Sequence, residues 1–440
     1  MSRQIEAKEI KLKKLITILT TLSLIALTIV PAVADTEVDI SGQVRVRSEI
    51  DGKSFDAANT TGIYELMRTR INIEANADEN ASAFIQFQDS RVLGGADQFD
   101  AWQSGSLNDG KNVDIHQAYV QIDRLWFDGF GTKAGRFEFN MGGQRVFGSV
   151  GWHNVARSWE GGLFWYKAET FKITSFCFKA QEEMETLDTL GNRDFDVFGG
   201  LIELDKINLE LFGIYERDND TLLNGTEDTV LAGCQLGRMT FGFYYKNKHN
   251  QLDFEFNGAY QAGSQMDTID IAAMMFTGEV GYSFEGDKKA RMAVGVDYAS
   301  GDDDLTDTDY KAYNNLYYTG HKFRGHMDYF LSSGSTGLMD IMLRGKFNPH
   351  PKWTVKGDFH YFKTAAEYTD VTTTSSTLTS DMGMEFDFAV NTSSVAGVKL
   401  EGGVSIFLPK ESLVRRMTND PASTDTDPTV WAWGQTVFNF

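Results

Sequence analysis

Cysteine and proline are scarce in this chain of 440 residues, with 2 and 6 copies respectively. So few cysteines exclude a disulfide-dense scaffold. Cys177 and Cys234 also fall on strands that are not neighbours in the pattern described below, so both are interpreted as small apolar residues rather than as a disulfide.

Basic residues are also fewer than acidic ones. The chain has 41 Lys and Arg but 62 Asp and Glu, so the formal net charge is -21. This balance argues against a nucleic-acid partner, because binding phosphates requires a basic face. Beyond residue 30 the sequence also lacks any apolar run of the roughly 20 residues that a membrane-spanning helix needs.

Glycine and aromatic residues are abundant instead, with 42 Gly, 32 Phe, 16 Tyr and 8 Trp. They suit strands and tight turns, and few long stretches follow the period of a helix. Segments of about ten residues alternate polar and apolar positions along the whole chain. One such segment alternates Gln43, Arg45, Arg47 and Glu49 with Val44, Val46 and Ile50.

This alternation predicts an all-β fold, a transmembrane antiparallel β-barrel of about 18 strands with short periplasmic turns and long extracellular loops. Short connections are expected near 78–80, 125–128, 205–206, 285–289 and 349–351. Long ones are expected near 51–62, 92–112, 141–158, 183–193, 218–227, 302–337, 365–380 and 409–429. A soluble β-sandwich would alternate in the same way, but it would not explain why short and long connections alternate. Residues 239–268 leave the count uncertain by one strand pair.

Both ends of the chain indicate export to the bacterial outer membrane. Basic residues at 11–14, an apolar run over 15–30 and the sequence AVA at 32–34 predict a signal peptide over residues 1–34, followed by one barrel domain over residues 35–440. A membrane anchor is the alternative, but the apolar run is short for one. The last segment, TVWAWGQTVFNF, is an amphipathic strand that ends on Phe440 and resembles the assembly signal of outer-membrane proteins. The expected partners are therefore outer-membrane lipid and the barrel-assembly machinery.

An arginine ladder on the first two strands is the main candidate site. Arg45, Arg47, Arg68 and Arg70 occupy polar positions, where they would project into the lumen beside Glu49 and Glu74. Similar positions further along the chain are occupied by Arg136, Glu138, Arg344, Lys346, Lys356 and Lys399. A ring of Arg and Lys selects anions in a pore. The alternative is that such charges only fill and brace a wide barrel.

Other chemistry is not indicated. The acidic run at 301–310 lacks the Gly and the distal Glu of an EF-hand loop, so a solvated outer loop is expected there rather than a Ca²⁺ site. None of the 7 histidines lies in a nucleophile elbow or a zinc-binding helix motif. We therefore expect a protein that is not an enzyme and that uses no metal or cofactor.

Three segments resemble the alginate-export family of outer-membrane barrels, in its broad branch with a Gly-Gln-Arg turn. They are GRFEFNMGGQRVFGSVGWHNVARSWEGG (135–162), TGHKFRGHMDYF (319–330) and GGVSIFLP (402–409). The resemblance covers essentially residues 36–440 and implies a polar, arginine-lined conduit, which in the best-known members passes an anionic polysaccharide. By position it places Arg136 and Glu138 on a strand and Gln144, Arg145, Trp152, Asn154 and Arg157 in the following loop.

Together these observations predict an outer-membrane channel for an anionic solute, with an acidic polysaccharide or oligosaccharide as the candidate. The predicted conduit residues are Arg45, Arg47, Arg68, Arg70, Arg136, Glu138, Arg145, Trp152, Asn154 and Arg157. Glu138 would position the arginines, and residues 143–162 would fold over the pore mouth. The alternatives are a general diffusion porin without substrate preference and a barrel with a plugged lumen.

Overall fold

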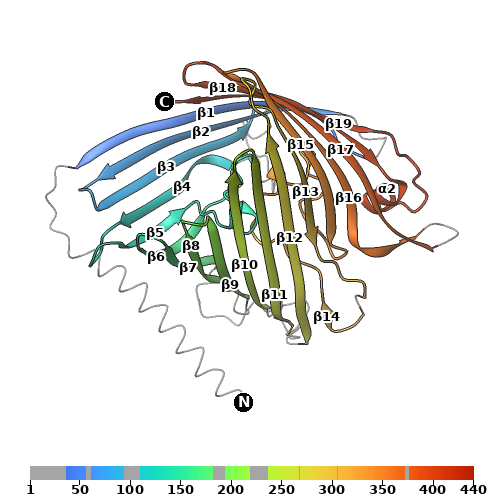
Figure 1. The fold of residues 1–440 in the computed structure, drawn as a ribbon, viewed down its shortest axis with the longest axis horizontal. Coiled ribbons are helices and arrows are strands. Elements are labelled where there is room, and N and C mark those ends of the chain that lie inside the picture. Colours follow the sequence, from blue (N-terminus) through green and yellow to red (C-terminus); the bar gives the residue numbers. More distant parts are fainter. Residues whose placement is uncertain are drawn as a thin grey trace.

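A computed structural model describes residues 36–55, 61–93, 110–181, 194–218, 236–266, 268–304, 306–371 and 376–440. The expected signal peptide and Cys234 lie outside these ranges. Within them, nineteen strands form one sheet. One of these, β14 (Asp309–Tyr310), is a two-residue strand in a loop and runs parallel to its neighbour β12. The other eighteen are antiparallel and close into a barrel (Figure 1), because β1 pairs with both β2 and β19.

The barrel strands are β1 (Glu37–Gly52), β2 (Gly62–Asn76), β3 (Ala81–Val92), β4 (Gly110–Ile122), β5 (Phe130–Phe137), β6 (Trp159–Lys167), β7 (Lys172–Gln181), β8 (Phe195–Leu204), β9 (Leu209–Asp218), β10 (Leu236–His249), β11 (Leu252–Gln265), β12 (Ile269–Ser283), β13 (Arg291–Ala299), β15 (Leu338–His350), β16 (Trp353–Val371), β17 (Ser376–Val395), β18 (Val398–Pro409) and β19 (Thr429–Asn439). The helical elements are η2 (Gly142–Gln144), η3 (Gly320–Lys322) and α2 (Glu411–Thr418). No helix in the described ranges is long and apolar enough to cross a membrane.

The strand count confirms the predicted barrel, and the uncertain region 239–268 contains most of β10 and all of β11, which form one hairpin. The long connection predicted over 365–380 is wrong for most of its length, because β16 extends to Val371 and β17 begins at Ser376. The segment is polar, but its Thr and Tyr residues are favourable in strands. The connection at 409–429 contains α2.

The two faces of each strand differ as the alternation predicts. On β1, Val46 and Ile50 point outward with 36% and 48% of their surface exposed, whereas Arg45 and Arg47 point inward and are buried. Exposed apolar side chains of this kind cover the outside of the barrel, as expected where strands face lipid.

Two connections on the same end of the barrel fold into its interior. We call residues 138–158, between β5 and β6, the first inner loop, and residues 300–337, between β13 and β15, the second inner loop. Their backbones pair, since Gly148 donates to the Tyr317 carbonyl (2.9 Å) and Tyr317 donates to the Val146 carbonyl (3.0 Å). The two loops therefore form one body inside the barrel.

An apolar core fills the interior beside the short strands β5 to β9. Its centre is Phe147 of the first inner loop, which is fully buried against Trp159, Phe176 and Phe178 of the wall. Residues from β11 to β13 also contribute to this core. The first inner loop is therefore packed against the wall on this side of the barrel.

The barrel closes where the last residue lies beside β1 (Figure 1). Gly42 and Phe440 exchange backbone hydrogen bonds of 2.8 and 3.1 Å. A Cβ atom at position 42 would lie only 2.7 Å from the Arg70 carbonyl oxygen and would also collide with the Phe440 ring. Closure therefore requires a residue without a side chain at this point.

We expect Gly42→Val to destabilise the refolded barrel by about 1–3 kcal/mol, the usual range for overpacking. Gly62→Val is the matched control, because a Cβ atom there would meet nothing closer than 3.9 Å. Urea titrations in detergent micelles, followed by heat-modifiable gel mobility, measure the difference. Equal stability of the two variants would contradict this account of closure.

Candidate functional site

The arginine ladder faces the interior, and three of its guanidinium groups hold the first inner loop by its backbone. Arg45 donates to the Gly151 carbonyl (2.9 Å) and Arg47 donates to the Trp152 carbonyl (2.8 Å). Arg68 donates to the carbonyls of Gly151 and His153, both at 3.2 Å. All three arginines are at most 5% exposed. Their donors are therefore directed at the loop rather than at open space.

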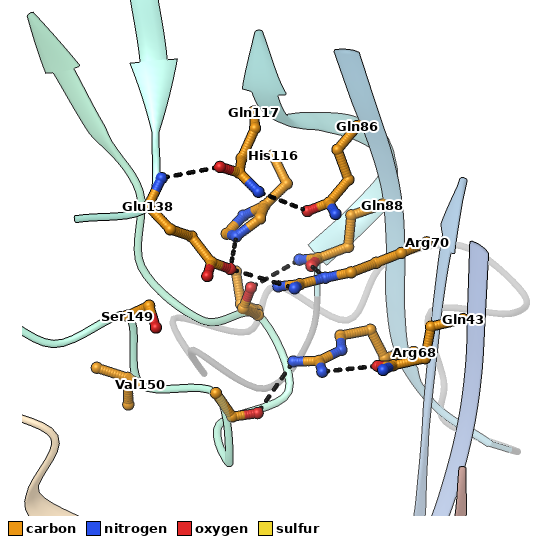
Figure 2. A network of polar contacts seen from close by, with 12 residues as sticks. Gln43, Arg68, Arg70, Gln86, Gln88, His116, Gln117, Glu138, Ser149 and Val150 are labelled. Atoms are coloured by element: carbon orange, nitrogen blue, oxygen red, sulfur yellow. Dashed lines mark hydrogen bonds and ion pairs between the residues drawn. The ribbon is translucent and has the colours of Figure 1, made fainter. Parts of the chain in front are cut away.

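The fourth member of the ladder belongs to a separate polar network (Figure 2). Arg70 donates to Gln88 (2.6 Å) and pairs with Glu138 (3.2 Å), and the same Glu138 oxygen lies 2.9 Å from His116 Nε2. The Glu138 backbone N–H donates to Gln117. Glu138 thus positions Arg70, and it fixes the start of the first inner loop to the wall formed by β2 to β4.

Asn154 fixes the same loop through its side chain and is completely buried. Its Oδ1 accepts from Arg45 (3.1 Å), and its Nδ2 donates to the Met67 carbonyl of β2 (3.1 Å). Its own carbonyl accepts from Ser90 of β3 (2.9 Å). A buried amide that meets both a wall side chain and a wall backbone group fixes the loop position tightly.

The two arginines within the first inner loop connect it to the second inner loop. Arg145 pairs with Asp297 (2.5 Å), which also accepts from Arg324 (3.2 Å). Arg157 donates to the Tyr317 carbonyl and, at 3.4 Å, to the Gly148 carbonyl. Both arginines therefore hold the loops together.

The prediction that Arg136 lines the conduit is wrong. The register places it on the same face as Ala134 and opposite Phe137, whose ring lies in the interior core. Its guanidinium pairs with Glu160 (2.5 Å) on the outside of the barrel. The prediction placed Arg136 on the same face as Glu138, which does point inward. The two residues do not share a face, because β5 ends at Phe137 and the alternation stops there.

Trp152 is packed rather than free. The Arg47 guanidinium lies 4.0 Å from the centroid of its ring, and the His321 ring stacks on it at 4.3 Å with an interplanar angle of 11°. Trp431 and Trp433 meet it edge-on. The indole therefore joins the ladder, the second inner loop and β19.

The second inner loop is held on a wall of carboxylates, which the predicted site did not include. The Met327 N–H donates to Glu385 (2.8 Å) and the His326 N–H donates to Asp387 (3.3 Å). Both carboxylates are at most 5% exposed. The alternation of Glu385 and Asp387 with Phe386 and Phe388 is a sequence signal that could have placed them inside.

Two adjoining cavities remain open beneath the loops. The smaller, of about 510 Å³, is lined by both inner loops and by the wall from β12 to β19. The larger, of about 860 Å³, lies against β8 to β15 near the short turns at 205–208 and 250–251. Glu279, Arg291 and Lys346 line both. Of the predicted conduit residues, only Trp152 lines either cavity.

The model of the alginate export family matches residues 36–417. The chain belongs to this family. No curated protein sequence matches the chain at a significant level.

Solved porins share the fold of this alginate export family member. OccK9 (OpdG) of Pseudomonas aeruginosa has a TM-score of 0.56 at 10% identity, covering 92% of this chain and 98% of that chain. A BenF-like porin from Pseudomonas fluorescens Pf-5 has a TM-score of 0.55 at 10% identity, with the same coverage. OpdK of Pseudomonas aeruginosa, solved with vanillate, has a TM-score of 0.53 at 8% identity, covering 91% and 98%. The family and the closed barrel identify an outer-membrane channel in a lipid environment.

No group of three or more His, Cys, Asp or Glu residues in the described ranges is arranged to hold a metal ion. In the acidic run, Asp304 accepts from Thr306, and Lys311 lies 3.4 Å from Asp303 and 3.6 Å from Asp307.

Removing one ladder arginine tests its attachment to the first inner loop. We expect Arg45→Ala to remove hydrogen bonds to the Gly151 carbonyl and to the buried Oδ1 of Asn154, at a cost of about 1–3 kcal/mol. Faster proteolysis of residues 138–158 and noisier single-channel currents would report the released loop. Arg136→Ala removes the same charge from the outer face and should change neither readout. Identical behaviour of both variants would contradict the assignment.

Acidification should weaken the attachment of the second inner loop. Burial lowers the pKa of His326 to about 4 from an ordinary 6.5, against the opposing effect of Asp387 and Asp328 and with help from His321 and His360. The docked loop therefore favours neutral imidazole. This contribution is complete above pH 6.5 and is lost as the pH falls toward 4.

We expect current flicker to increase between about pH 7.5 and about pH 4.5, and His326→Gln to reduce this pH response. An unchanged pH response in the variant would show that His326 does not control the loop.

Proposed function

We propose that this outer-membrane channel passes an anionic solute, with an acidic polysaccharide or oligosaccharide as the candidate. The observation that carries the proposal is the charge of the smaller cavity. Five cationic side chains line it against three carboxylates: Arg291, Lys322, Arg344, Lys346 and Lys356 against Glu279, Asp358 and Glu401. Cationic side chains around a pore favour anions.

In this proposal the arginine ladder acts on the solute indirectly. Arg45, Arg47 and Arg68 are directed at loop carbonyls, so their role is to fix the first inner loop where it narrows the conduit. The solute instead meets the smaller cavity, whose lining combines loop residues such as Trp152 with wall cations. The resemblance to a polysaccharide-exporting family supports a saccharide as the solute.

A general diffusion porin is the second candidate, and the larger cavity favours it. Six carboxylates line that cavity against four cations: Glu203, Asp205, Glu210, Asp253, Glu255 and Glu279 against Lys246, Lys248, Arg291 and Lys346. A channel whose two cavities have opposite charge balance would select anions in one part only. Such a channel would discriminate only weakly between anions and cations if the larger cavity dominates permeation.

Reversal potentials in planar bilayers under a KCl gradient separate the candidates. We expect chloride to permeate better than potassium, because the narrower cavity controls selectivity. In liposome swelling, glucuronate should then enter faster than glucose. Equal entry of the two sugars would favour a general porin, and a preference for potassium would contradict the proposal.

A further inference from the structure

Three cations stand side by side on the inner wall. The register pairs Arg291 of β13 with Lys346 of β15, and Lys346 with Lys356 of β16. The three residues therefore occupy one row across adjacent strands, and all of them line a cavity. Like charges directly opposite each other destabilise a sheet unless another group compensates them.

The nearby carboxylates compensate only one end of this row. Arg291 pairs with Asp253 and with Glu279 (2.7 Å), and the other oxygen of Glu279 is taken by Arg344 (3.2 Å). Lys346 and Lys356 are exposed and have no ion pair or hydrogen bond within the described part of the chain. Two uncompensated ammonium groups thus face the cavity.

The other acidic groups of the smaller cavity form no ion pair with the two lysines, although Asp358 is close enough to interact electrostatically with Lys356. Glu401 is engaged by Lys399 (2.5 Å) and Gln435 (2.5 Å). Asp358 lies two residues along β16 from Lys356, in the row of Arg344, and makes no ion pair with either lysine. Bracing the wall therefore does not account for Lys346 and Lys356, because bracing requires a partner.

The position of the pair suits contact with a moving solute. Lys346 lines both cavities and so lies where they join, while Lys356 lines the smaller one. Directly opposed residues on antiparallel strands have Cβ atoms about 4.5–5.5 Å apart, which allows two lysines to share one anionic group. Each ammonium offers three donors on a flexible stem, so the pair can follow a solute over a short distance.

We propose that Lys346 and Lys356 form a binding subsite for an oxyanion group, a carboxylate or a phosphate, of the permeating solute. The subsite rests on the proposed function and moves the anion-recognising surface from the arginine ladder on β1 and β2 to the wall formed by β15 and β16. Binding relieves the repulsion between the lysines, and it leaves the ladder engaged with the first inner loop.

The test is a double variant, Lys346→Gln with Lys356→Gln, in planar bilayers. We expect its chloride-to-potassium permeability ratio to fall roughly fivefold, because two charges beside the conduit are lost. The same two positions changed to Arg should keep the ratio. Lys288→Gln removes an exposed charge from a turn that lines neither cavity and should leave the ratio unchanged.

Current block by added solutes identifies the ligand independently of ion selectivity. Glucuronate, inorganic phosphate and glucose are the probes; block by the first alone indicates a carboxylate site, and block by both anions indicates a general oxyanion site. The double variant should lose the block.

If the wild type prefers chloride but the double variant keeps both selectivity and block, the subsite is wrong and the proposed function stands. If the wild type lacks anion preference but shows a block that needs the lysines, the subsite stands and the proposed function fails. Block by glucose equal to that by the anions would overturn the subsite.

Discussion

The interior of this barrel depends on hydrogen bonds between wall guanidinium groups and the backbone carbonyls of a loop. A loop that enters a barrel takes its peptide groups away from water, and each unpaired carbonyl there costs free energy. Arg45, Arg47 and Arg68 supply the donors for residues 151–153. Arginine suits this role because its donors are rigidly spaced and remain charged when buried.

The second inner loop is attached by the opposite arrangement. There the wall supplies acceptors, Glu385 and Asp387, and the loop supplies backbone N–H groups. Arg145 and Arg324 meet between the loops on one buried carboxylate, Asp297. The wall therefore offers donors to the first inner loop on β1 and β2 and acceptors to the second inner loop on β17. Together with the apolar core around Phe147, this arrangement leaves the smaller cavity along β12 to β19 and the larger one along β8 to β15.

The sequence predicted the fold well, because lipid outside and polar groups inside impose a period of two on every strand. The same rule placed the ladder inside. It failed at Arg136, because it was extended from Glu138 past the end of a strand. The alternation also did not predict which groups the arginines of the ladder contact. The partners of Arg45, Arg47 and Arg68 are backbone carbonyls. Every residue has a backbone carbonyl, so the side chains of the loop give no sequence signal for these contacts.

Charge on the wall therefore has two separate uses. Buried cations whose donors are engaged, such as Arg45, shape the conduit, whereas exposed cations without partners, such as Lys346, remain available to solutes. Sequence alone does not separate the two groups, because both occupy inward positions of strands. The separation requires the path of the two inner loops, and this depends on contacts between residues far apart in the chain.

Anomalous diffraction from crystals soaked in bromide tests this division most directly, since bromide marks every cation that is open to a permeating anion. The account predicts bromide peaks beside Lys346 and Lys356 and none within contact distance of Arg45, Arg47 or Arg68. Bromide bound along the ladder, with the lysine pair empty, would contradict it.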